Sequence, residues 1–299
     1  MATSLPPFSI FLQPGTDESN IASRVDVTAN SRYAPLAAAF SAVSHHLATT
    51  PLAVTIFLRL VITVWAQNDG AHDAFGPDPP TKDNIVQALI TDLPDLVIFD
   101  IPDEGQSPDT YIRWGRVKRG ISAISQRNEI YVHSELVDAF LAPNGSDTSL
   151  FHHVILLVTL SHETSHIIFK KLFTAAFDPP VQATPGDGGA LGESDLNFEN
   201  RFLGFVPTAI LPPQGLNAQR LWNISSIVAE TGSDTYSLSI SKLQELVASF
   251  YNNGSFTFDS GTAPLANVPH GSVRYRSACQ PVINPAITLL PRIGDWDRY

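Results

Sequence analysis

The segment at residues 151–173 constrains the fold most, because it reads as a helix that is apolar on every side. Its first half contains the run VILLVTL at residues 154–160, and its second half contains IIF at residues 167–169. A helix of this composition is buried inside a protein. We therefore expect the rest of the chain to pack around this segment.

Three ionisable side chains, two histidines and a glutamate, interrupt the middle of this helix in the sequence HETSH. His162 and His166 are four residues apart, which places both imidazole rings on one face, one turn from each other. Glu163 projects beside them. Burying unpartnered polar groups is costly, and a metal ion would serve as a partner for all three. The alternative is a core helix whose three polar residues are hydrogen-bonded without a metal.

This segment resembles the active-site helix of the zincin metallopeptidases, whose HExxH motif supplies two zinc ligands and a general base. Residues 128–140, NEIYVHSELVDAF, add to the resemblance because they read as a strand followed by a short helix. Zincins commonly have such a strand beside the substrate cleft. The resemblance covers about residues 129–205. The layout is also similar to that of little-characterised fungal metallopeptidases. The resemblance to the zincins implies a Zn²⁺ ion held by His162 and His166.

A catalytic zinc site needs a third protein ligand, and its fourth position is left for water. The residues after His166, IIFKKLFTAAF, contain neither a glycine nor another histidine, which excludes the metzincin pattern. An aspartate ligand of the aspzincin type is disfavoured, because residues 231–236 read as a hairpin turn. The gluzincin pattern, with a glutamate on a later helix, remains.

Residues 192–203, GESDLNFENRFL, contain two candidates for the third ligand. Glu193 is followed by Asn197 at the gluzincin spacing, and Asn197 would then orient one of the histidines. Glu199 is the alternative, because on a helix it falls among leucine and phenylalanine side chains. The two glutamates are about 120° apart around the helix, so we expect only one of them, Glu193 first, to bind the ion.

Composition and charge limit the kinds of partner that we expect for this protein. The chain has 299 residues, of which 43% are hydrophobic and 16% charged, as in a globular protein. Its net charge of −11 argues against nucleic acid as a partner. The single cysteine, Cys279, permits no internal disulfide, and the first 20 residues lack the regions of a signal peptide. These features favour a cytoplasmic protein.

The remaining segments predict an α+β fold, with a small mixed sheet beside the active-site helix and a mainly helical N-terminal part. Strands are predicted at 96–100, 111–117 and 129–133, a hairpin at 224–240, helices at 34–47, 51–67, 84–90 and 241–251, and loops at 69–82 and 206–215. Asp83 is the expected cap of helix 84–90. The adjacent His45 and His46 are expected at the surface or as caps.

We expect a single catalytic domain over residues 1–299, with a helical subdomain at 1–90 and a zincin-like core at 92–299. Residues 51–67 are apolar but fall short of the roughly 20 residues of a membrane span. Arg59 also interrupts them, so no membrane partner is expected.

The resemblance implies a zinc-dependent metallopeptidase that hydrolyses peptide bonds by a metal-activated water, with Glu163 as general base. Its partner would be a peptide or protein substrate, bound in extended form at an edge strand of the sheet. One alternative is a non-catalytic, zincin-fold regulatory or interaction protein that binds metal. Another is a metal-free interaction protein in which HExxH arose by chance.

Overall fold

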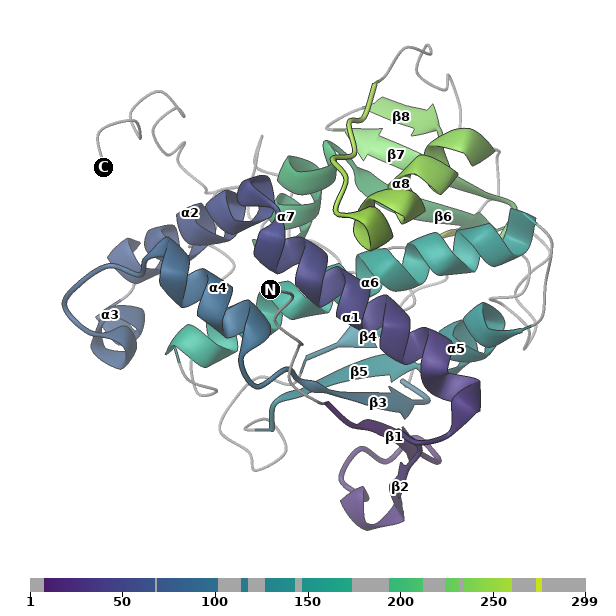
Figure 1. Ribbon diagram of the computed structural model, residues 1–299, viewed down its shortest axis with the longest axis horizontal. Helices are drawn as coiled ribbons and strands as arrows, with labels where there is room; N and C mark the ends of the chain where they lie inside the picture. Colours follow the sequence, from purple (N-terminus) through teal and green to yellow (C-terminus); the bar gives the residue numbers. More distant parts are fainter. Residues whose placement is uncertain are drawn as a thin grey trace.

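The segment predicted as a buried helix forms α6, Asp147–Phe173, which runs through the middle of the molecule (Figure 1). The computed structural model describes residues 8–67, 69–101, 114–117, 127–142, 147–173, 194–211, 224–231, 234–259 and 273–275. Within these residues the chain forms eight α-helices and two small sheets, which confirms the predicted mixture of helices and strands.

The other helices are α1 Ala34–Thr49, α2 Pro51–Gln67, α3 Asp69–Phe75, α4 Lys82–Ile90, α5 Ser134–Leu141, α7 Ser194–Leu203 and α8 Ile240–Asn252. The predictions at 34–47, 51–67 and 241–251 are confirmed. No single helix in the described part is long and apolar enough to cross a membrane. The two segments 31–49 and 51–66 meet that criterion only together, as a pair bent by 77°.

The larger sheet lies on one side of α6 and has the strand order β2-β1-β3-β5-β4. Its strands are β1 Ile10–Gln13, β2 Val25–Asp26, β3 Asp95–Phe99, β4 Gly115–Arg116 and β5 Glu129–His133. The three central strands are parallel, and both edge strands are antiparallel to their neighbours. Alternate residues of β3 and β5, such as Ile98 and Val132, face the helices and join the main core.

The second sheet is antiparallel, with the order β8-β7-β6-β9. Its strands are β6 Val206–Leu211, β7 Ser226–Thr231, β8 Asp234–Ser237 and β9 Val273–Tyr275. The predicted hairpin is confirmed by β7 and β8. The loop predicted at 206–215 is wrong for β6, because Ala209 and Ile210 are buried between two partner strands. Tertiary pairing outweighs the turn signal of the nearby prolines.

Two predictions around residues 69–90 are also wrong. The expected loop at 69–82 contains α3, whose end is held because Trp65 Nε1 donates a 3.0 Å hydrogen bond to the Gly76 carbonyl. Phe75 packs edge-on against Phe173 of α6. The cap of α4 is Thr81, and not Asp83, since Thr81 and Asn84 form a reciprocal capping box.

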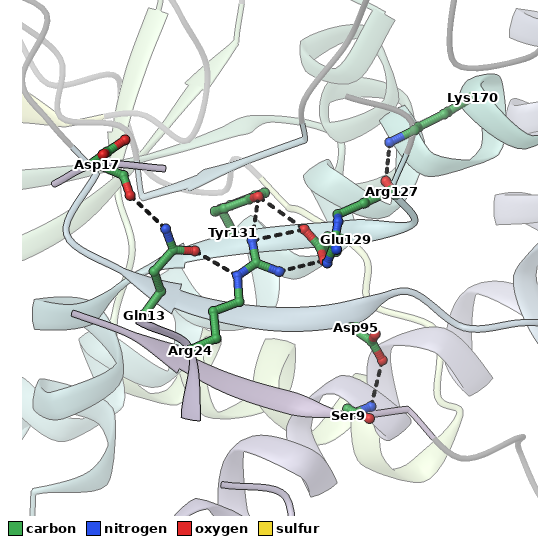
Figure 2. Close-up of polar contacts among 9 residues, drawn as sticks. All are labelled: Ser9, Gln13, Asp17, Arg24, Asp95, Arg127, Glu129, Tyr131 and Lys170. Carbon is green, nitrogen blue, oxygen red and sulfur yellow. Dashed lines mark hydrogen bonds and ion pairs between the residues drawn. The ribbon is translucent and has the colours of Figure 1, made fainter. Parts of the chain in front are cut away.

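A buried polar cluster lies on the face of the larger sheet that points away from α6 (Figure 2). Arg24 donates to both carboxylate oxygens of Glu129, at 2.6 and 3.2 Å, and both side chains are only 5% exposed. Arg24 also donates to Gln13 and to the Tyr131 hydroxyl, each at 2.8 Å. The cluster therefore ties the segment between β1 and β2 to β5.

The same cluster reaches the end of α6. Arg127 donates to Glu129 at 3.1 Å, and the Arg127 carbonyl accepts a hydrogen bond from Lys170 of α6 (Figure 2). Burial by itself raises the pKa of Glu129, but the hydrogen bonds from Arg24 and Arg127 outweigh burial and hold that pKa below its usual value.

Replacing Glu129 tests the stabilising role of this cluster. Glu129→Gln leaves Arg24 buried without its counter-charge, which lowers the free energy of unfolding by about 3 kcal/mol at pH 7. In the wild type, the stabilisation that Glu129 provides is fully present above pH 4.5, the ordinary pKa of its carboxyl group. It disappears as the pH falls through the lowered pKa of this group in the folded protein. Urea unfolding of both proteins at pH 7 and pH 3 measures this.

The exposed pair Arg32–Asp138, 2.6 Å apart and more than half exposed, is the matched control. Asp138→Asn should change stability by less than about 1 kcal/mol. A cost of Glu129→Gln that is equal at both pH values would contradict the assignment.

Candidate metal centre

The HExxH residues lie at the centre of α6 and are almost completely enclosed. His162 and Glu163 are each 2% exposed, and His166 is 8% exposed. The two imidazole rings are adjacent, with their centroids 5.3 Å apart and their planes inclined by 71°. The prediction that one buried helix brings the two rings side by side is therefore confirmed.

The hydroxyl-bearing neighbours of this motif behave differently. Ser161, Thr164 and Ser165 each donate to a backbone carbonyl three or four residues earlier in α6, at 2.7–2.8 Å. Hydroxyls can be satisfied within their own helix in this way. The imidazole of His162, by contrast, has a partner on another helix.

Glu199 of α7 is such a partner. It is 1% exposed, and its Oε1 lies 2.8 Å from Nδ1 of His162. An ionised carboxylate only accepts hydrogen bonds, and toward such a group Nδ1 would be the donor. Nε2 is then the nitrogen through which His162 would bind a metal. A carboxylate on the second ring nitrogen is the usual way to orient a metal-binding histidine.

Aromatic packing holds α7 in place for this contact. Phe198 stacks on Phe57 of α2, with centroids 4.2 Å apart and planes 6° from parallel. Phe202 packs at 5.6 Å against the ring of His46 from α1. The N-terminal helices therefore position Glu199 indirectly.

The third ligand is not fixed by these residues. Within the part of the chain that the structure describes, no group of three or more His, Cys, Asp and Glu side chains is arranged to hold a metal ion. Glu193, the first choice from the sequence, lies outside the described residues, as does the side chain of Asn197. Glu199 contacts His162 at Nδ1. The two imidazoles fit two positions of a zinc site, which takes three protein ligands.

Comparison of the chain with protein-family models, with curated proteins and with solved structures found no match. The basis for a function is therefore the residues and their geometry.

The other histidines near α6 lie away from this pair. His152 is fully buried, and His153 Nε2 lies 2.8 Å from the Tyr251 hydroxyl. The expectation that His46 is a surface or capping residue is wrong, since it is 2% exposed and packs against Phe202 and Phe250. Residue spacing within α1 gives no sign of this, because the covering phenylalanines belong to α7 and α8.

His46 makes the docking of α7 sensitive to acid. Burial, assisted by the charge of His45, lowers the pKa of His46 to about 4. The unfolded chain takes up a proton on this histidine near pH 6.5, whereas the folded protein does so only near pH 4. Stability should therefore fall as the pH drops from 6.5 to 4, by about 3 kcal/mol in total, and level off below.

His46→Leu should remove this pH dependence, whereas His45→Gln should keep it. Urea unfolding between pH 4 and 7 measures all three proteins. A wild type and a His46→Leu variant with parallel pH profiles would contradict the burial of a neutral His46.

Proposed function

We propose that this protein is a zinc-dependent metallopeptidase with a zincin-like core. The observation that carries the proposal is the adjacent, buried pair of His162 and His166 on α6, with Glu163 beside them and Glu199 on His162 Nδ1. Three of these side chains are 2% exposed or less and His166 is 8% exposed, so they lie together inside the protein. Two imidazoles and carboxylates are a donor set that suits zinc.

In this proposal each residue has a distinct role. Zinc, when bound, lowers the pKa of a water ligand to about 7 and polarises a substrate carbonyl. His162 and His166 hold the ion through ring nitrogens, and Glu199 keeps the His162 ring in position. Glu163 accepts a proton from the water whose oxygen attacks the peptide carbon. It then delivers that proton to the leaving nitrogen as the C–N bond breaks.

The sheet edge next to α6 supports a peptide as the substrate. Among the described residues, β4 has β5 as its only partner strand. His133 N donates to the Trp114 carbonyl at 2.8 Å, so in the alternating antiparallel ladder the N–H and C=O of Gly115 point away from β5. An extended polypeptide pairs with such an edge through its own backbone.

Metal content is the first test. Purified wild type should contain about one zinc per chain by elemental mass spectrometry, and His162→Ala and His166→Ala should lose it because each removes a ligand. Glu199→Gln should still bind zinc at saturation but about 10- to 100-fold more weakly, because it removes only the orienting contact.

The third ligand is sought with Glu193→Ala and Asp195→Asn. Asp195 is included because it precedes Glu199 in α7 by four residues, which is one helical turn.

A wild type that binds no metal after zinc is added back would refute the proposed function.

Glu163→Gln tests the catalytic step. The variant should keep its zinc and its melting temperature, while its hydrolysis of a mixed peptide library falls at least about 100-fold, because amide replaces the general base. Cleavage is followed by mass spectrometry of the library. A zinc-loaded wild type that cleaves no more than Glu163→Gln would instead indicate a metal-binding protein without turnover.

A further inference from the structure

Gly115 of β4 lies directly against Glu163 and Thr159 of α6. A Cβ atom at this position would lie 2.9 Å from Cγ and 3.2 Å from Oε1 of Glu163, and 2.5 Å from Cγ2 of Thr159. Real Cβ atoms essentially never have contacts under 3.0 Å. Gly115 does not have a positive φ, so its glycine is needed for space and not for backbone conformation.

Strand β4 is anchored on both sides of Gly115, so it cannot simply move away from α6. The Trp114 side chain before it is fully buried, and the Trp114 carbonyl accepts from His133 N. Arg116 after it pairs with Glu18 on the opposite face of the sheet, where both side chains are largely buried. The backbone of β4 is therefore held in position next to the Glu163 side chain.

We propose that Gly115 positions the carboxylate of Glu163: the bare backbone of β4 limits where that side chain can lie. The inference rests on the proposed peptidase function for its catalytic consequence. A general base has to lie within hydrogen-bond reach of the proton it accepts. A displacement of about 1 Å can cost about 100-fold in rate.

Gly115→Ala tests the positioning role. The nearest atoms to the added methyl group belong to Thr159 and Glu163 and not to either histidine, so it should displace Glu163 while zinc content matches wild type. In the zinc-loaded protein kcat should fall by about 10- to 100-fold with KM nearly unchanged. Full activity in Gly115→Ala would overturn the inference.

Thr159→Ser separates positioning from packing. It removes Cγ2, the atom 2.5 Å from the new methyl, and leaves Glu163 untouched. In Gly115→Ala with Thr159→Ser the melting temperature should recover in part, because the 2.9 Å contact with Glu163 Cγ remains, while kcat stays low. If kcat recovers together with the melting temperature, Gly115 has a packing role only and the inference fails. Thr159→Ser alone is the control and should keep wild-type activity.

A third experiment does not depend on catalytic activity. Glu163→Ala removes both Glu163 atoms that the new methyl would meet, so Gly115→Ala should lower the melting temperature of zinc-free protein less in that background than in wild type. Equal losses in both backgrounds would overturn the inference. An inactive wild type with clear coupling would refute the peptidase function, yet it would support the fixed position of Glu163.

Discussion

Two imidazoles and a carboxylate are buried in the middle of α6, and the elements packed around this helix have to accommodate them. The segments 154–160 and 167–169 on either side are largely apolar, and α6 packs against helices and against strands of both sheets. The hydroxyls near His162 bond within their own helix, whereas His162 contacts Glu199 of α7. A buried polar group is tolerable only with a partner. The α7 helix supplies one for His162 through Glu199, and β4 lies against Glu163 at Gly115.

The approach of α7 depends on aromatic packing supplied by the first part of the chain. Phe198 lies flat on Phe57, and Phe202 contacts His46. These contacts place the Glu199 carboxylate on Nδ1 of His162. The N-terminal helices thus influence the contact between Glu199 and His162, although both residues belong to other helices.

The approach of β4 depends on the sheet behind it. Arg24 and Glu129 join the segment between β1 and β2 to β5, and the Lys170 contact joins the start of β5 to the end of α6. Because β5 is the partner of β4, this cluster helps to fix the strand that carries Gly115. Polar contacts on the outer face of the sheet are in this way linked to the position of Glu163 on the inner side.

The sequence by itself determined the features that depend on neighbouring residues. The buried helix with its histidine pair, the strands at β3 and β5 and the hairpin of β7 and β8 all follow from local periodicity and turn residues. Only the tertiary structure decided that Glu199 meets His162, that His46 is buried and that β6 is a strand. The physical reason is that each depends on a partner far along the chain. A helical wheel shows which residues share a face, but it does not show which other element that face will meet.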